Sequence, residues 1–175
     1  MAIGEALERW HDFYMLVGTA GATLVALLFV AVSLGTGFLT EQRAAPTRAF
    51  YSPVVLHFTA IFFVSAGGLV PARTAIFFAG AVGLTALIGG GASVFATVQL
   101  LRNRWTPYLQ DHLAYGVLPA ICYGALLIAA CMIVADAPHA LDLVGGTLLV
   151  LMVVNIRNAW DLMLSMVRRH VEPPQ

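Results

Sequence analysis

Residues 74–101 read TAIFFAGAVGLTALIGGGASVFATVQLL and contain no charged side chain. A helix needs about 20 apolar residues to cross a hydrocarbon core roughly 30 Å thick, so this stretch is long enough to span a bilayer. Four other stretches share this character. The sequence therefore predicts an all-α membrane protein, a bundle of five transmembrane helices, with spans at about 13–39, 50–70, 74–101, 113–135 and 140–167.

A short amphipathic helix is expected before the first span, because Ile3, Leu7, Trp10 and Tyr14 recur at helical spacing. We expect this helix, over residues 2–12, to lie at the membrane interface. No loop is long enough for a separate domain, so residues 1–175 are interpreted as a single integral membrane domain.

The overall composition agrees with a membrane location and excludes several functions. Of 175 residues, 60% are hydrophobic and 10% charged, with a mean hydropathy of +0.86, whereas soluble domains carry about 25% charge. All nine basic residues are arginine, so Schiff-base chemistry and a P-loop, which need lysine, are excluded. A net charge of zero without a basic face argues against nucleic acid as a partner. No HExxH, GxSxG or paired-carboxylate motif supports an enzyme.

Arginine placement predicts the orientation, because short cytoplasmic loops retain basic residues. With the N-terminus outside and the C-terminus inside, two arginines fall outside, Arg9 and Arg73. Six fall inside, namely Arg43, Arg48, Arg102, Arg104, Arg168 and Arg169. An alanine-rich chain without lysine is typical of GC-rich bacterial genomes, so we expect a bacterial inner (plasma) membrane.

Small residues form a seam along the span at 74–101, with alternating spacings of four and three. They are Ala79, Gly83, Ala86, Gly90, Ser93 and Thr97. In lipid, small residues allow close approach of another helix. We therefore expect span three to be a buried central helix or a subunit contact within a homo-oligomer. In the alternative, the glycines at 89–91 unwind, and Ser93 and Thr97 line a polar path.

The same spacing in the first span places three hydroxyls on one stripe, those of Thr19, Thr23 and Ser33, which continues to Gly37. Serine and threonine can donate to a carbonyl in the preceding turn, which satisfies them without another partner. That interpretation is favoured, and pore lining or helix contact is the alternative.

The fifth span ends in the densest polar cluster of the chain, formed by Asn155, Arg157, Asn158, Asp161 and Ser165. If the span begins near residue 141, about 20 residues bring it to Trp160, and Arg157 reaches the cytoplasmic interface as an anchor. If the arginines at 168 and 169 mark the exit, Arg157 lies near mid-bilayer and needs Asp161 or another partner, which would form a buried structural or conducting network.

His57 is the one histidine well inside a predicted span. An intramembrane ionisable residue is a functional candidate for a proton relay, or for binding haem, a quinone or a lipid among Phe58, Phe62 and Phe63. The favoured alternative is a neutral histidine bonded to a neighbouring helix. No cofactor is predicted otherwise.

Acidic and histidine residues gather at the outer side, with Glu8, His11 and Asp12 near the N-terminus and Asp136, His139 and Asp142 before the fifth span. Such groups can bind a divalent metal. Solvated interfacial charge is favoured, so Glu8, His11, Asp136 and His139 are only weak metal candidates.

Function is therefore expected to be that of a homo-oligomeric channel or transporter for an ion or small solute. Its path would be lined by hydroxyls of spans one and three and gated by the polar cluster of span five. The alternatives are a binding protein for haem, quinone or lipid near His57, and a structural or assembly subunit of a membrane complex.

Overall fold

The computed structural model describes residues 3–35, 41–71, 74–103 and 113–171, and these contain helices and turns but no strand. Gly37, Arg73 and Arg104, which enter the sequence analysis, lie outside the described residues. The elements are α1 (Ile3–Arg9), α2 (His11–Gly35), α3 (Glu41–Leu69), α4 (Ala75–Asn103), the π-helical turn η2 (Leu113–Val117), α6 (Leu118–Val134) and α7 (Ala140–Val171).

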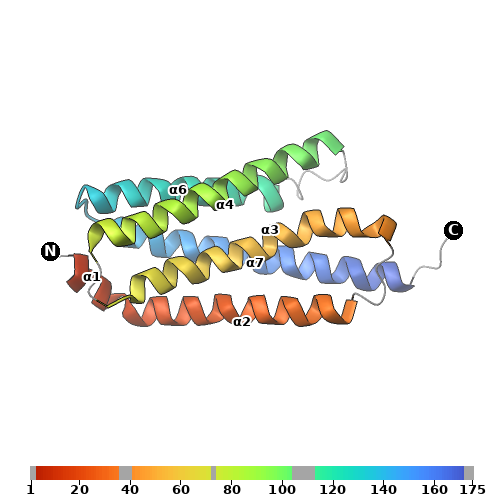
Figure 1. Ribbon diagram of the computed structural model, residues 1–175, viewed down its shortest axis with the longest axis horizontal. Helices are drawn as coiled ribbons and strands as arrows, with labels where there is room; N and C mark the ends of the chain where they lie inside the picture. The colour runs from red at the N-terminus through yellow and green to blue at the C-terminus, as the bar shows by residue number, and fades with distance from the viewer. Residues whose placement is uncertain (1–2, 36–40, 72–73, 104–112, 172–175) are drawn as a thin grey trace.

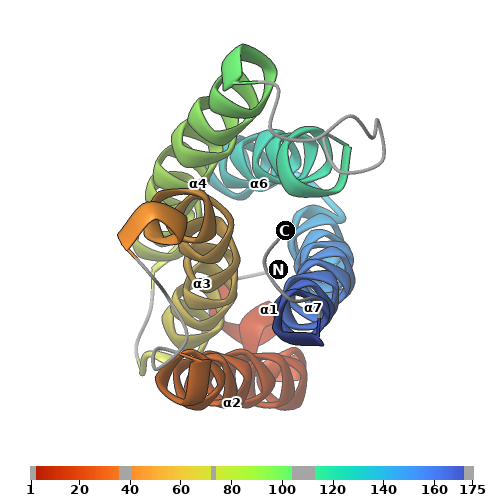
Figure 2. The same ribbon diagram turned by 90° about the vertical axis from the view of Figure 1, so that its right-hand side faces the viewer.

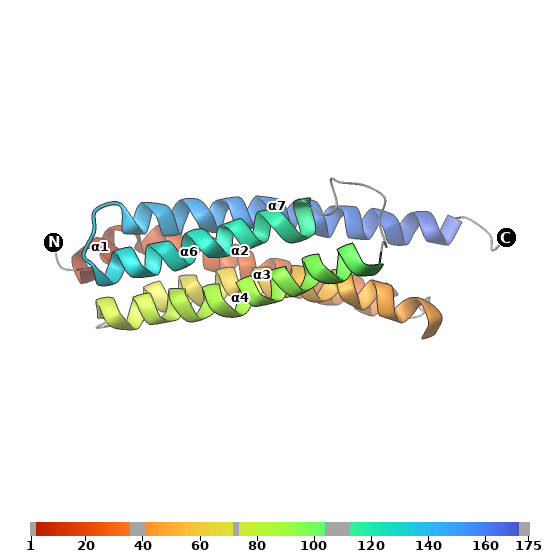
Figure 3. The same ribbon diagram turned by 90° about the horizontal axis from the view of Figure 1, so that it is seen from above.

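The long helices lie side by side and alternate in direction, so the two ends of the chain lie at opposite ends of the bundle (Figure 1). Seen along the bundle, α4 packs on α6, α2 packs on α3, and α7 contacts both α3 and α6 (Figure 2). From above, α6 and α7 run along one side and α3 and α4 along the other (Figure 3). The helix α3 thus contacts α2, α4 and α7.

Four of the helices in the described part of the chain are long and apolar enough to cross a membrane. These stretches are His11–Ala31, Ala75–Gln99, Ala114–Val134 and Ala140–Leu164. The second predicted span is not among these four. The apolar part of α3 is Pro53–Leu69, which is shorter than the length required of a full span. The all-helical class and four of the five predicted apolar helices are thus confirmed.

The surface of the bundle is apolar. Leu16, Phe29, Ile76 and Val153 each expose more than two thirds of their surface. Soluble monomers rarely expose so large an apolar surface, and this distribution is compatible with a membrane location.

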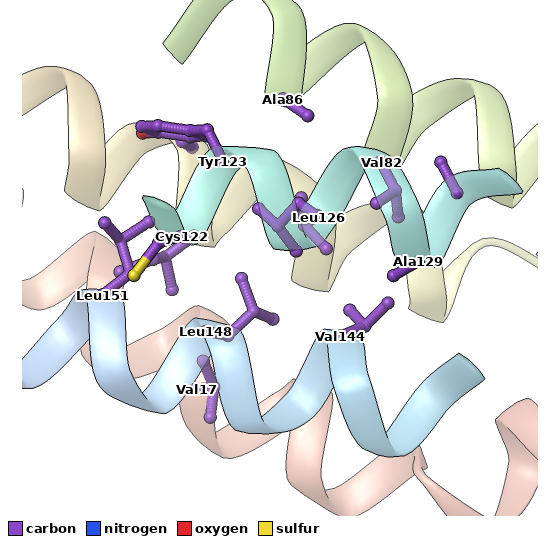
Figure 4. Packing of buried hydrophobic residues seen from close by; sticks show 14 of the residues in the cluster. Val17, Val82, Ala86, Cys122, Tyr123, Leu126, Ala129, Val144, Leu148 and Leu151 are labelled. Carbon is purple, nitrogen blue, oxygen red and sulfur yellow. The ribbon is translucent and has the colours of Figure 1, made fainter. Parts of the chain in front are cut away.

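The interior is also apolar and closely packed. Figure 4 shows Val144 and Leu148 of α7 pointing toward Ala129 and Leu126 of α6, and all four are buried. In a membrane, where lipid solvates apolar side chains as well as protein does, such packing would hold the helices together through dispersion contacts rather than through the hydrophobic effect.

The small-residue seam of α4 packs against α6 of the same chain. A Cβ on Gly83 would lie 3.6 Å from the Ala130 Cβ, and one on Gly90 would lie 3.4 Å from the Tyr123 Cβ. The helix is continuous through residues 89–91, so the alternative of unwinding there is wrong. The seam is occupied by α6 within the chain, as expected of the packing interpretation.

Two further features concern helix ends. The N-terminal helix forms over Ile3–Arg9, and Leu7 is fully buried against the bundle. Pro119 lies in the first turn of α6, directly after the π-helical turn η2.

The turn between α6 and α7 is closed by backbone hydrogen bonds. The Asp136 N–H donates to Ile133 O at 3.2 Å, and the Ala137 N–H donates to Met132 O at 2.9 Å. This pair of bonds is a Schellman motif, and Asp136 takes the left-handed position with φ of 48°.

Candidate functional site: a polar core between α3, α6 and α7

Six polar side chains are buried within the described part of the bundle: His57, Ser65, Ser93, Thr147, Asn155 and Asn158. Ser93 is satisfied locally, because its hydroxyl donates to Gly89 O at 2.8 Å. His57 and the two asparagines instead bond to other helices. We call His57, Tyr123, Asn155 and Asn158 the polar core.

His57 of α3 is 1% exposed and is bonded to α6. Its Nδ1 lies 2.8 Å from the hydroxyl of Tyr123, and the two ring centroids are 5.5 Å apart. The tyrosine ring fits because residue 89 is glycine, since a Cβ there would overlap the ring. His57 therefore has the interhelical bond that is expected of a packing histidine.

Asn155 joins α7 to α3. The side chain is completely buried, and its Nδ2 donates to Val54 O at 2.8 Å. Val54 precedes His57 by three residues, about one helical turn. The two polar contacts of α3 therefore lie close together along its axis.

Asn158 joins α7 to the π-helical turn. Its Nδ2 donates to Ala114 O at 2.8 Å, and its own backbone carbonyl accepts the Tyr115 hydroxyl at 2.8 Å. Two reciprocal bonds thus fix the start of α6 on α7. Turns of π-helix are frequent at functional sites.

Several buried atoms of this region have no hydrogen-bond partner among the described residues. They are His57 Nε2, Asn155 Oδ1, Asn158 Oδ1 and, nearer the other end of α3, Ser65 Oγ. Each unsatisfied buried polar atom costs about 1–3 kcal/mol. Three of these atoms belong to residues of the polar core, so hydrogen-bonding capacity is left unused there.

The polar core lies deep in the bundle. Leu69 comes twelve positions after His57 in α3, about 18 Å of helix, and Asn155 comes fifteen positions after Ala140 in α7, about 22 Å. In a hydrocarbon core of about 30 Å, both residues would lie well below the surface. Asn158 is one turn farther along α7.

The predicted polar cluster of α7 is divided between two faces. Asn155 and Asn158 face inward, whereas the Arg157 and Asp161 side chains are 48% and 41% exposed and form an ion pair at 3.5 Å. The expectation of one cluster that contains all four is therefore wrong. The side chain of Ser165 is outside the described part of the chain.

The hydroxyls predicted to line a shared path do not meet. Thr19, Thr23 and Ser33 all face outward from α2, and the last two donate to carbonyls one turn earlier, at 2.8 Å each. Thr97 of α4 likewise donates to Ser93 O at 2.8 Å. Since the α4 seam faces α6, the expected path between spans one and three is absent from the described chain.

The residues predicted to lie on the outer side are exposed, and two histidines are paired locally. His139 Nδ1 lies 2.9 Å from Asp142 Oδ2, and His11 Nδ1 lies 3.1 Å from Asp12 Oδ1. A surface pocket of about 360 Å³ is lined by Trp10, Asp136 and His139. Within the described residues no three metal-binding side chains come together, so Glu8, His11, Asp136 and His139 are not brought into one cluster.

The expected aromatic environment of His57 is only partly present. Phe58 is buried, but Phe62 and Phe63 are 40% and 59% exposed and contact each other edge to face, with centroids 5.6 Å apart. Sequence reasoning missed Tyr123 and Tyr115. Their signal was a hydroxyl within an apolar stretch, because buried tyrosines usually have a hydrogen-bond partner.

No family model matches the chain, and no curated protein and no solved structure is similar enough to it to count as a match. The case for a function therefore depends on the geometry of the polar core.

Proposed function

We propose that the chain is an integral membrane protein with five spans, the N-terminus outside and the C-terminus inside a bacterial inner membrane. The position of α3 supports a fifth span, because α3 contacts three helices of the bundle along its length. Its apolar part, Pro53–Leu69, covers about 26 Å, close to a hydrocarbon core of about 30 Å. An odd number of crossings agrees with chain ends at opposite ends of the bundle (Figure 1).

We further propose that the protein is a channel or transporter whose route passes through the polar core. The observation that carries this proposal is the group of unpartnered buried atoms on α3 and α7, namely His57 Nε2, Asn155 Oδ1 and Asn158 Oδ1. In lipid, buried polar side chains are costly and mark ion or substrate pathways. The outward-facing hydroxyls of α2 are not part of this route.

The helix contacts also suggest how the route could open. Asn155 is hydrogen-bonded to α3, and Asn158 is hydrogen-bonded to η2. A small movement of α7 relative to these elements would therefore change both hydrogen bonds at once. Tyr123 holds His57 from the side of α6. Transport sites are commonly formed where several helices contribute polar groups near the midplane.

The test is flux in proteoliposomes that contain the full chain. Imposed proton and alkali-cation gradients are followed with fluorescent indicators, and neutral solutes by light scattering. The wild type is expected to dissipate at least one gradient faster than empty vesicles, and His57→Phe and Asn155→Leu are expected to lose most of that flux. Arg157→Ala, on the exposed face of the same helix, is the matched control and should keep it. Flux equal to that of empty vesicles in every assay would refute transport.

A second function, binding of haem, quinone or lipid at His57, has one observation in its favour, the unpartnered Nε2. With His57 only 1% exposed, the helices would have to separate to admit a large ligand. An absorption spectrum and a lipid extract of the purified protein test this function. A Soret band or an enriched quinone that disappears in His57→Phe would favour it over transport.

A homo-oligomer remains part of the proposal, now through α2 rather than α4. Thr19, Thr23 and Ala26 form an exposed stripe of small residues on α2, and such stripes favour close helix contacts in lipid. Native mass spectrometry from mild detergent gives the number of subunits. The wild type is expected to be oligomeric, and Thr23→Ile, which adds a large side chain to the stripe, is expected to be monomeric. If the wild type is also monomeric, this part of the proposal is refuted.

A further inference from the structure

The orientation of both buried asparagine amides is determined by their partners. The Val54 and Ala114 carbonyls can only accept hydrogen bonds, so the atom that faces each of them must be Nδ2. The free atom of each side chain is consequently the carbonyl oxygen Oδ1, and both of these oxygens are unpartnered.

The two oxygens belong to one region of the interior. Asn155 and Asn158 are three residues apart on α7, so their Cβ atoms are about 5–6 Å apart on one face of the helix. Both side chains are at most 1% exposed. A single small species between them could therefore contact both oxygens.

The region has an excess of hydrogen-bond acceptors. The carbonyls of Val54, Ala114 and Asn158 already receive the available Nδ2 and tyrosine donors. Two amide oxygens are left over. Two kinds of small species can satisfy two acceptors at once, a water molecule that donates two hydrogen bonds and a monovalent cation.

The charge of the ligand follows from the charge of its surroundings. The bonded partners of Asn155 and Asn158 are backbone carbonyls and a tyrosine hydroxyl, which carry no formal charge. Arg157 is turned away and paired with Asp161. Neutral oxygens in a low dielectric can hold one positive charge, but a divalent ion would lack any compensating carboxylate.

We propose that Asn155 Oδ1 and Asn158 Oδ1 form a binding site for an alkali metal cation, which is the species that the polar core transports. This inference rests on the proposed transport function and specifies its substrate class. Neutral carbonyl oxygens, those of selectivity-filter loops and of unwound helix segments, are the ligands of K⁺ and Na⁺ in channels and transporters, and the amide oxygens of asparagine have the same donor chemistry.

The experiment measures thermal unfolding of the full chain in detergent micelles, in NaCl, KCl, LiCl and choline chloride at equal ionic strength. At an excess of about a hundredfold over the dissociation constant, the bound cation should raise the wild-type Tm by about 5 °C relative to choline. The rise should be concentration-dependent and specific for one or two of the alkali ions.

Asn155→Leu and Asn158→Leu keep the approximate shape of the side chain but remove its amide, both the oxygen and the Nδ2 donor. The loss of Nδ2 lowers the Tm in every salt alike, whereas the loss of the oxygen should abolish the cation-specific rise. Thr85→Val is the matched control, because the Thr85 hydroxyl is satisfied by Ala81 O on α4, away from α7, and this variant should keep the rise. If one leucine variant does not fold, the other and the wild-type salt comparison still decide the outcome.

Equal wild-type Tm values in all four salts would overturn the cation site and leave a neutral water molecule as the occupant. A rise that persists in both leucine variants would also overturn it, because the cation would then bind elsewhere. The outcome is separate from that of the flux assay. Cation stabilisation without flux supports the site but not transport, whereas proton flux without cation stabilisation supports transport but not this site.

Discussion

Tyr123 of α6 and His57 of α3 are joined by a hydrogen bond of 2.8 Å, and the tyrosine ring reaches the histidine by lying over Gly89 of α4. Three helices therefore meet at one contact. Since the hydroxyl is the polar end of a large apolar ring, the same side chain both packs the α4–α6 interface and satisfies the histidine. Loss of space at Gly89 should disturb the polar core directly.

Gly89→Ala is expected to destabilise the protein by about 1–3 kcal/mol, the usual cost of overpacking a close contact. The added Cβ would overlap the Tyr123 ring, whereas a Cβ on Gly91 meets nothing within 4 Å. Gly91→Ala is therefore the control, and it should be neutral or stabilising by up to about 1 kcal/mol through helix propensity. Unfolding in detergent with increasing SDS compares the two. Equal stability of the two variants would contradict the close contact at Gly89.

The His57–Tyr123 bond should appear as a coupling energy. Tyr123→Phe and His57→Phe each remove one partner, and the double variant should be more stable than the sum of the single losses predicts. Interhelical hydrogen bonds measured this way in membranes average about 0.6 kcal/mol and reach about 1.7 kcal/mol. The same SDS titration on all four proteins gives the value. Strict additivity would mean that the bond does not contribute.

The buried face of α7 that carries Asn158 should contribute more to the free energy of unfolding than the exposed face that carries Arg157 and Asp161. Asn158→Ala breaks a buried bond to η2 and should cost about 1–3 kcal/mol, because the Ala114 carbonyl is left unsatisfied. Arg157→Ala and Asp161→Ala break an exposed i,i+4 pair that is worth about 0.3–0.5 kcal/mol. Unfolding midpoints of the three variants in one detergent test the order. If Arg157→Ala lowered the stability more than Asn158→Ala does, the Arg157 side chain would have to be buried.

The helices were predictable because each apolar stretch is long and is ended by polar or proline residues. The span predicted at 74–101 corresponds to the helix Ala75–Asn103, and the span predicted at 140–167 corresponds to the helix Ala140–Val171. The second span was harder, because α3 begins with the polar stretch Glu41–Arg48 and its apolar part is short.

The faces of the helices were less predictable. In lipid, a helix is apolar on every side, so hydropathy does not reveal which side of α2 carries Thr19 and Thr23 outward. The division of the α7 cluster follows from helix geometry, because residues 155 and 158 share one face and residues 157 and 161 share another. The partnership of His57 with Tyr123, separated by 66 residues, leaves no trace in a single sequence.

The turn before α7 offers a final prediction about stability. Asp136 holds the left-handed position of the Schellman motif, with φ of 48°, which costs an L-residue about 1–2 kcal/mol and glycine almost nothing. Asp136→Gly should therefore raise the free energy of unfolding by about 1 kcal/mol. The neighbouring Ala135 has φ of −80°, so Ala135→Gly relieves no strain, loses chain stiffness and should lower stability by up to about 1 kcal/mol. Thermal unfolding of both variants in the same micelles measures the difference. Because Asp136 also lines the surface pocket beside Trp10 and His139, flux should be measured in parallel. A more stable Asp136→Gly variant with unchanged flux would exclude the aspartate from the proposed transport route. A less stable variant would mean that its carboxylate contributes more to the turn than its strained backbone costs.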